Sequence, residues 1–273
     1  MPRIDIDALQ TILRDAAIAE ILPRFRRLDD SMVKQKTEAI DLVTEADTNA
    51  ERVIKARVAE LMPEALFVGE ESVAADPSLL DRLDEADLAV VVDPVDGTAN
   101  FAAGLPLFAV MAAVVSQGET VAGIIYDPMG DDWFVAEKGG GAFMKRPDGG
   151  AERLQVAAPM PLAQMVGTCS IAYLPAESKP QVLANLAKVR VAANYRVAGH
   201  DYRLFASGHT HFIMFNKLMP WDHLAGTLIV QEAGGYVARF DGSAYRPEHR
   251  TGGLIAAANR ESWELLRREV FAV

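Results

Sequence analysis

The chain has 273 residues, half of them apolar and a quarter charged, which is enough to bury a large core and excludes a wholly disordered protein. Its formal net charge of −11 argues against a nucleic-acid-binding protein, because phosphate backbones are bound by an excess or a patch of Lys and Arg. Cys169 is the only cysteine, so an intrachain disulfide is excluded and a reducing cytosol is favoured. Neither a signal-peptide pattern nor an apolar run of about 18 residues occurs, so we expect a cytoplasmic protein that does not enter a membrane.

Two helices are predicted at the start of the chain. Apolar residues recur at helical spacing from Asp5 to about Leu28. A second helix should begin after Thr44, because Thr44 and Asp47 resemble a capping box, and it should end at Pro63.

A mainly antiparallel sheet is predicted next. The segments "ALFVGEES" (65–72) and "LAVVVDPVDGT" (88–98) each indicate a short buried strand that runs out into an acidic turn. Two apolar arms around a Gln-Gly-Glu turn in residues 108–128 are typical of a β-hairpin, and residues 131–145 add further strands around glycines. We therefore expect residues 1–150 to form an α+β half.

The glycine-rich turn "RPDGG" (146–150) marks a boundary. Beyond it, a strand in "MVGTCSIA" (165–172) precedes helical patterns in residues 179–189, 221–235 and 259–271. This alternation predicts a second, α/β half over residues 151–273, with helices covering a sheet.

The acids of "DPVDGT" suggest a cation site. Asp93 and Asp96 are three residues apart, which can turn both carboxylates toward one point, and the Val95 carbonyl lies between them. Such an all-oxygen set suits a hard cation such as Mg²⁺, and Thr98 adds a hydroxyl. The alternative is an ordinary turn with a capping and a solvated aspartate.

Three further acids strengthen the metal hypothesis. Glu70 and Glu71 follow the neighbouring strand, and Asp222 opens an apolar helix. Taken alone, the two glutamates could be an exposed loop pair and Asp222 a helix N-cap. If these acids converge, they cannot all stay ionised without a cation. Two Mg²⁺ ions about 4 Å apart would hold the attacking and leaving oxygens of a phosphoryl transfer.

These motifs occur together in a known family. The chain resembles the inositol monophosphatase family of Mg²⁺-dependent, lithium-sensitive phosphomonoesterases, which is related to fructose-1,6-bisphosphatase. The matching segments are "DLVTEAD" (41–47), "GEES" (69–72), "DPVDGTANF" (93–101), "GGGAF" (139–143) and "WDHLAG" with "QEAGG" (221–235). The resemblance implies a layered α/β/α/β/α fold, a small phosphomonoester as substrate, Mg²⁺ as cofactor and a homodimer.

The resemblance also implies which residues hold the metal. One Mg²⁺ would be bound by Glu70, Asp93 and the Val95 carbonyl, and a second by Asp93, Asp96 and Asp222. A third, more weakly bound ion would contact Glu70 through a water molecule.

The residues implied at the reacting atoms are Asp47, Thr98 and Glu71. Thr98, oriented by Asp47, would contact the attacking water, and Glu71 would help to orient that water. The N–H groups of Gly97 and Thr98 would meet the phosphate. Lys36 matches a basic position that the family uses near the metals.

The sequence departs from the family where the alcohol should bind. Family members that hydrolyse inositol phosphates carry a Glu shortly before the Trp-Asp pair, but this chain has Phe215, Asn216 and Lys217 there. Inositol phosphate is therefore one candidate substrate beside histidinol phosphate and sugar phosphates. A non-catalytic regulatory or binding protein on the same fold is a further alternative.

A second departure is the segment "RVAGHDYR", from which we take Arg196, Gly199, His200 and Asp201 as candidate substrate-binding residues. His200 and Asp201 could face the leaving group and select a cationic or differently shaped alcohol. Arg203 could grip a second anion. The alternative is a structural salt link or the start of a helix.

Overall fold

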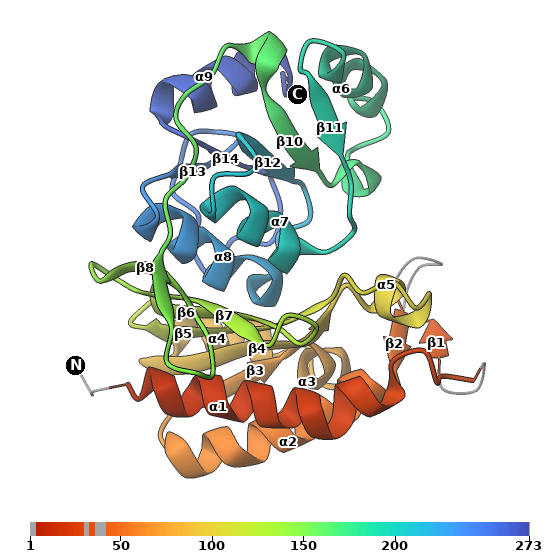
Figure 1. Ribbon diagram of the computed structural model, residues 1–273, viewed down its shortest axis with the longest axis vertical. Helices are drawn as coiled ribbons and strands as arrows, with labels where there is room; N and C mark the ends of the chain where they lie inside the picture. Colours follow the sequence, from red (N-terminus) through yellow and green to blue (C-terminus); the bar gives the residue numbers. More distant parts are fainter. Residues whose placement is uncertain (1–3, 30–32, 36–41, 273) are drawn as a thin grey trace.

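Helical and sheet layers alternate through the molecule (Figure 1), and the expected α/β/α/β/α arrangement is confirmed. The computed structural model describes residues 4–29, 33–35 and 42–272. The outer layer on one side holds α1 (Ile6–Ala16) and α2 (Glu45–Leu61). The middle layer holds α7 (Ala198–Ala206) and α8 (Pro220–Glu232), and the far outer layer holds α6 (Lys179–Leu186) and α9 (Arg260–Glu269).

Two sheets separate these helical layers. The larger sheet has seven strands in chain order, β3 (Leu66–Gly69), β4 (Leu88–Asp96), β5 (Ala109–Ser116), β6 (Glu119–Asp127), β7 (Asp132–Glu137), β8 (Gly141–Lys145) and β9 (Ala151–Arg153). The smaller sheet has five strands in the order β11 (Val191–Ala193), β10 (Val166–Cys169), β12 (Phe212–Phe215), β14 (Leu254–Ala257) and β13 (Tyr236–Arg239). Short elements complete the fold: β1 (Val33–Gln35), β2 (Leu42–Thr44), α3 (Glu70–Ala75), α4 (Leu79–Glu85) and α5 (Thr98–Ala102).

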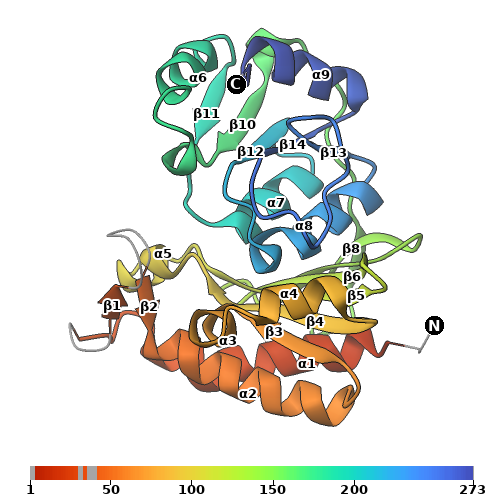
Figure 2. The same cartoon turned by 180° about the vertical axis from the view of Figure 1, so that it is seen from behind.

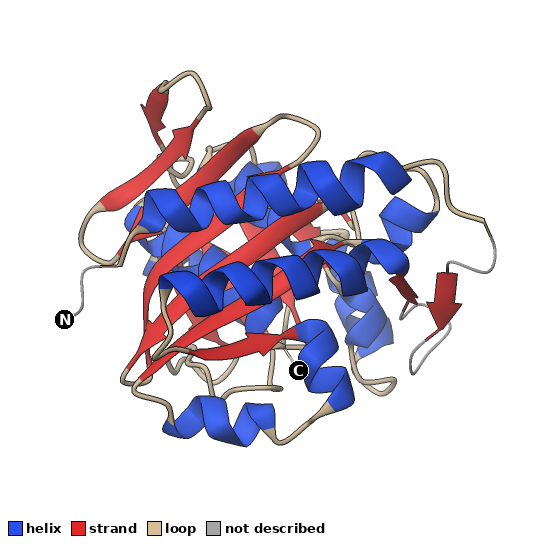
Figure 3. Ribbon diagram, turned by 90° about the horizontal axis from the view of Figure 1, so that it is seen from below, coloured by secondary structure: helices blue, strands red, loops and turns tan. Residues whose placement is uncertain are grey.

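The two N-terminal helices form where the sequence predicts them. Figure 3 shows α1 and α2 side by side across the strands of the larger sheet. After α1, the chain continues as a π-helical turn at Ala17–Ile21 and a 3₁₀-helical turn at Leu22–Arg24. The expected capping box opens α2, since the Thr44 N–H donates to Asp47 Oδ2 at 2.8 Å and Thr44 Oγ1 accepts from the Ala46 N–H at 3.2 Å.

In the larger sheet, β4 is the strand at which the pairing changes from parallel to antiparallel. It pairs with β3 in parallel and with β5 antiparallel, and β5 to β9 continue antiparallel. Val90 and Val92 pack against α1 and α2, whereas Ala89 and Val91 face the middle layer. Both faces of β4 are buried, which explains its continuous apolar sequence.

The middle layer joins the two halves of the chain. Figures 1 and 2 place α7 and α8 between the two sheets, although they belong to the second half of the sequence. Their apolar residues form one core with the inner face of the larger sheet. The strand β9 also pairs with β8, so the larger sheet continues three residues past the expected boundary at residue 150, to Arg153.

A separate apolar cluster holds α6 and α9 against the outer face of the smaller sheet. Val182 from α6 and Trp263 and Leu266 from α9 belong to it, together with Cys169. Burial raises the pKa of the Cys169 thiol, which is consistent with an inert core residue. Within the described ranges, the helices are too short or too polar to cross a bilayer.

A close backbone contact sets how α8 lies on the larger sheet. A Cβ atom added to Gly123 of β6 would lie 2.8 Å from the Ala225 Cα and carbonyl oxygen of α8. We expect Gly123→Ala to push α8 away from the sheet and to lower the free energy of unfolding by about 1–3 kcal/mol, measured by urea denaturation. Ala151→Val, on the exposed strand β9, is the control and should leave stability within about 0.5 kcal/mol of the parent. Equal stability of the Gly123 variant and the parent would contradict the contact.

Candidate active site

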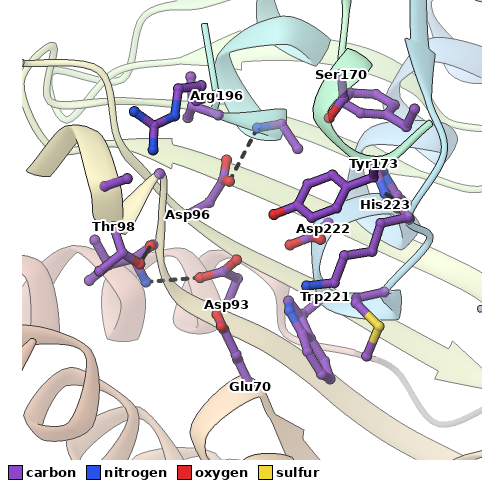
Figure 4. Close-up of a pocket in the computed structure, with 18 of the residues that line it drawn as sticks. Glu70, Asp93, Asp96, Thr98, Ser170, Tyr173, Arg196, Trp221, Asp222 and His223 are labelled. Atoms are coloured by element: carbon purple, nitrogen blue, oxygen red, sulfur yellow. Dashed lines mark hydrogen bonds between the residues drawn. The ribbon is translucent and has the colours of Figure 1, made fainter. Parts of the chain in front are cut away.

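A cavity of about 830 Å³ lies where the two halves of the chain meet. Its walls come from the end of β4 and the starts of α3, α5, α7 and α8, together with parts of residues 170–173 and 215–219. In Figure 4 the side chains of Glu70, Asp93, Asp96 and Asp222 gather in the centre. Thr98 and Arg196 lie on one side of them, and Ser170 and Tyr173 on the other.

The end of β4 differs from the acidic turn that the sequence predicts. Asp93 and Asp96 both remain in the strand, and a bulge lies between them, since Asp93 pairs with Met111 but Asp96 with Ala109. Pro94 has no N–H to donate across the sheet, and the Val95 N–H donates instead to Asp93 Oδ1 at 3.0 Å. The chain turns only at Gly97, whose φ of 87° is in the left-handed region.

The carboxylate of Asp96 is bound to the start of α7. Ala198 N–H donates to Oδ1 at 3.1 Å and Gly199 N–H donates to Oδ2 at 2.5 Å. The first N–H groups of a helix have no partner within the helix and favour a negative charge. Gly199 therefore holds Asp96 rather than lining the cavity.

Three carboxylates come together at the centre of the site. Asp93, Asp96 and Asp222 each offer an oxygen within 4.8 Å of the others. Asp222 lies in the first turn of α8, but the N-cap of that helix is Met219, so the simple capping alternative does not hold. Glu70, the first residue of α3, lines the same cavity.

Burial and mutual repulsion weaken the acidity of this cluster. Burial raises the pKa of Asp96 to about 7, against the lowering effect of the α7 N–H groups. Burial, and then the charges of Glu70 and Asp96, raise the pKa of Asp93 well above its usual range. The pKa of Asp222 is also raised, first by burial and then by Asp96 and Glu70.

The donor set fits a hard divalent cation such as Mg²⁺. All the atoms that converge are carboxylate oxygens, and Val95, whose carbonyl oxygen lies 3.0 Å from Thr98 Oγ1, lines the same cavity. His223, the neighbour of Asp222, already uses both ring nitrogens, with Nε2 at 2.8 Å from the Lys217 carbonyl oxygen and Nδ1 at 3.1 Å from the Tyr202 hydroxyl. A bound cation would supply the positive charge that these carboxylates need to be ionised together.

A hydroxyl–carboxyl pair lies beside the cluster. Thr98 Oγ1 is 3.0 Å from Asp47 Oδ1 and 3.0 Å from the Val95 carbonyl oxygen, so its single proton is shared between two acceptors. Asp47 is fully buried at the start of α2. Burial raises the pKa of Asp47 to about 6, against the lowering effect of the Thr44 hydroxyl.

Comparison with known proteins agrees with this geometry. A model of the inositol monophosphatase family matches residues 5–271. The chain belongs to the inositol monophosphatase family. It is 35% identical over 206 residues to inositol-1-monophosphatase of Mesorhizobium japonicum, which covers 74% of this chain and 73% of that protein. It is 32% identical over 248 residues to the Pasteurella multocida protein named Nus factor SuhB, covering 89% and 88%. The crystal structure of extragenic suppressor protein suhB from Bartonella henselae has a TM-score of 0.82 and 32% identity, over 97% of each chain.

Family membership supports a phosphatase. Of the residues expected to contact the substrate, Gly199, His200 and Arg203 do not line the cavity. Asp201 lines the cavity, as does Arg196, whose φ of 58° is in the left-handed region. The expectation for His200 is corrected, because its ring faces away and its Nε2 lies 3.1 Å from the Phe108 carbonyl oxygen. Successive residues of a helix point in different directions, so His200 and Asp201 do not share a face. Arg203 does not line the cavity either, and it binds Asp132 at 2.5 Å.

Of the other residues predicted for the site, Gly97 and Thr98 line the cavity, whereas Glu71 does not. Glu71 is not part of the cavity wall, and its backbone N–H donates to Glu51 Oε2 at 2.7 Å. Lys36 lies outside the described residues. Gly97 and Thr98 line the cavity at the start of α5.

Glu51 is a site residue that the sequence reasoning missed. Its buried carboxylate accepts from the Glu71 N–H at 2.7 Å and from the Ser72 N–H and hydroxyl at 2.7 and 2.6 Å. It therefore caps the short helix α3 from a neighbouring helix and fixes Glu70 at its start. A Cβ atom on Gly69 would lie 2.3 Å from this carboxyl carbon, which explains the glycine of "GEES". An acid on the apolar face of α2, one turn after Asp47, was the available signal.

The raised pKa values make the stability of the cation-free protein depend on pH. Folded Asp47 and Asp96, with pKa values of about 6 and 7, keep protons that the unfolded chain releases near pH 4. This contribution to stability is complete below about pH 4 and is lost as the pH rises through about 7. In EDTA, we expect the thermal unfolding midpoint to fall by on the order of 5 °C between about pH 5 and pH 7.5.

Two variants test the origin of this slope. Asp222→Asn removes one of the crowded carboxyls and should flatten it. Asp87→Asn makes the same change at an exposed residue just before β4 and should keep the parent slope. A midpoint that rises over this pH interval would refute the assignment of the shifts.

Proposed function

We propose that the chain is a Mg²⁺-dependent phosphatase that hydrolyses a small phosphomonoester by attack of a water molecule. The observation that carries this proposal is the convergence of Asp93, Asp96 and Asp222, with oxygens within 4.8 Å, next to the Thr98–Asp47 pair in one cavity. Membership of a phosphatase family supports the same reaction class.

Two groups of ligands would hold the cations. Glu70, Asp93 and the Val95 carbonyl would bind one Mg²⁺, and Asp93, Asp96 and Asp222 would bind another, with a third ion leaning on Glu70 through water. Bound there, Mg²⁺ supplies positive charge that offsets the carboxylates and the charge that develops on the phosphoryl oxygens.

The Thr98–Asp47 pair would move the proton of the attacking water. Thr98 Oγ1 points its proton at Asp47 Oδ1 or the Val95 carbonyl, which leaves oxygen lone pairs to accept a proton from water. As the water attacks, its proton passes to Thr98 Oγ1 while the Thr98 proton passes to Asp47. A carboxyl whose pKa is about 6 is well matched to this exchange near neutral pH.

Backbone groups and side chains at the cavity wall would bind the substrate. The N–H groups of Gly97 and Thr98, at the start of α5, would meet the phosphate, and Arg196 lines the same cavity. Roles for Glu71 in orienting the water and for Lys36 near the metals stay predictions.

The alcohol is less closely defined than the phosphate. The cavity wall has Phe215 and Lys217 where an inositol-phosphate hydrolase of this family carries a glutamate. Inositol, histidinol and sugar phosphates are therefore the candidates. The name of the Mesorhizobium relative favours the first of these, whereas the apolar Phe215 favours an alcohol with fewer hydroxyls.

A second candidate function is partner binding. A relative that is 32% identical, from Escherichia coli, is named Nus factor SuhB, as is the Pasteurella protein. The complete set of acids around the cavity favours the enzyme, because a protein that only binds a partner has no use for three buried like charges. A homodimer remains a prediction.

Metal dependence tests the proposed reaction directly. Phosphate release from a panel of phosphomonoesters should be absent after EDTA treatment and should return when Mg²⁺ is added. Li⁺ should inhibit, and raising Mg²⁺ should reverse the inhibition if both ions use the carboxylate cluster. No release from any member of the panel at any Mg²⁺ concentration would overturn the phosphatase and favour the binding protein.

Removal of the shared ligand gives the sharpest mutational test. Asp93→Asn should lower kcat at least about 100-fold, because Asp93 is proposed to contact both cations, while far-UV circular dichroism stays unchanged. Asp87→Asn, the same change before the other end of β4, should keep the parent kcat. Near-parent turnover by Asp93→Asn at saturating Mg²⁺ would sink the ligand assignment.

A further inference from the structure

Lys217 is a cation in the cavity that the proposed chemistry does not use. It lies between β12 and α8. Of the described residues that line the cavity, Lys217 and Arg196 are the two that carry a positive charge. The imidazole of His223 adds none near neutral pH, because burial lowers its pKa to about 4. Arg196 lies on the same side of the carboxylates as Thr98, where the phosphate is expected (Figure 4).

The ammonium of Lys217 lies on the opposite side of the cavity from Arg196. It is 5.2 Å from the centre of the Tyr173 ring, and Figure 4 shows Tyr173 across the carboxylates from Arg196. The Lys217 charge also reaches Asp222: burial raises the pKa of Asp222, and the Lys217 charge opposes this rise. Tyr173 and Asp222 both line the cavity, so the ammonium between them is directed into it.

Hydrogen bonds hold this wall of the cavity in place. His223 Nε2 lies 2.8 Å from the Lys217 carbonyl oxygen, and this nitrogen carries the proton because a carbonyl only accepts. His223 Nδ1 then accepts from the Tyr202 hydroxyl at 3.1 Å. Asn216 Nδ2 donates to the Tyr173 carbonyl at 2.7 Å. The backbone of Lys217 and the ring beside its ammonium are therefore positioned before a ligand enters, which reduces the entropic cost of binding.

The charge of Lys217 has no partner of its own. Over the described ranges of the chain, Lys217 forms an ion pair with neither Asp nor Glu. Cations bound at the cluster would offset the charge of Asp222. Burial raises the pKa of Asp201, the remaining acid of the wall, well above its usual range, which disfavours its charge. An anion on the substrate is then the group that would compensate Lys217.

A single ammonium suits an anion with a single charge. Lys offers one point charge with three donors and lacks the planar fork with which Arg binds a phosphate in two places. A second phosphate group would carry nearly two negative charges at neutral pH. It would need a further cation at this end of the cavity, where the described wall provides Lys217 alone. A carboxylate carries one charge and matches the ammonium.

We propose that Lys217 is a specificity-determining residue that binds a carboxylate on the alcohol of the substrate. The substrate class is then a phosphorylated hydroxy acid, with the carboxylate a few bonds from the phosphate ester. This inference rests on the proposed function and adds a charge requirement to it. Phe215, two residues before Lys217, stands where inositol-phosphate hydrolases of the family carry a glutamate. A wall that would repel a carboxylate is thus replaced by one that attracts it.

A matched pair of phosphomonoesters tests the inference. The two are ⁻OOC–(CH₂)n–O–phosphate and its carboxamide, H₂NOC–(CH₂)n–O–phosphate, with spacers of one to four carbons, because they differ in charge but hardly in size. For at least one spacer, we expect the parent enzyme with Mg²⁺ to give kcat/KM at least about fivefold higher for the carboxylate. The difference should lie mainly in KM. Added NaCl should reduce it, because salt screens an accessible ion pair.

Three variants assign this preference to the ammonium. Lys217→Met keeps the length of the side chain without its charge, so the ratio of carboxylate to carboxamide should fall to about one. Lys217→Arg keeps the charge and should keep the ratio above one, whereas Lys217→Glu should bring it below one. Lys138→Met removes an exposed charge outside this cavity and should leave the parent ratio unchanged. Thermal unfolding checks that each variant is folded.

The possible failures can be told apart. Equal kcat/KM for the two compounds, or no hydrolysis of either by a parent that hydrolyses other phosphomonoesters, would overturn the inference and leave the phosphatase standing. A Lys217→Met variant that loses the same factor on both compounds would show a structural role and would also overturn it. A bisphosphate of the same spacer, preferred by more than the statistical factor of its two equivalent ends, would overturn the assignment to a carboxylate. No hydrolysis of any phosphomonoester with Mg²⁺ would overturn the proposed function and this inference together.

Discussion

The two oxygens of Asp96 accept hydrogen bonds from the first N–H groups of α7, and this contact joins the two halves of the molecule. The bulge in β4 directs Asp96 toward α7, while α8, which carries Asp222, packs directly on β6 through Gly123. The oxygens of Asp93 and Asp222 are therefore close together only when the middle helical layer is in place. The carboxylate cluster is a property of the whole fold, because neither half contains it alone.

Crowded like charges oppose the stability of this arrangement, and the surrounding structure compensates for them. Burial and repulsion raise the pKa values of Asp93, Asp96 and Asp222 together. Two nearby acids are held by several donors: Glu51 receives three, and Asp47 receives the N–H and hydroxyl of Thr44, which lower the pKa of Asp47 against the larger effect of burial. The fold thus keeps its destabilised groups at the point where a cation or substrate can satisfy them.

Local patterns were sufficient to predict the longer helices, the strands of the larger sheet up to residue 145 and most of the acids. The capping box at Thr44, the hairpin at Gln117 and the buried run of β4 depend on neighbours in the sequence. The bulge in β4 could not be foreseen, because it depends on how Pro94 interrupts pairing with β5.

Features that depend on packing between distant elements could not be predicted from the sequence. The direction of His200 follows from where α7 begins and how it packs on β5, so the sequence offered no means to separate it from Asp201. Glu51 acts on α3 only because α2 lies beside it in the fold.

The carboxylates Asp93 and Asp96 lie at the carboxyl end of β4, at one end of the strands of the larger sheet. The turn between β5 and β6, at Gln117 and Gly118, lies at the opposite end of these strands, where Ser116 pairs with Leu88 at the start of β4. The eight residues of β5 separate these two ends by about 25 Å. A fluorophore or a surface-attachment tag inserted in that turn would therefore leave the reacting end of the sheet unobstructed.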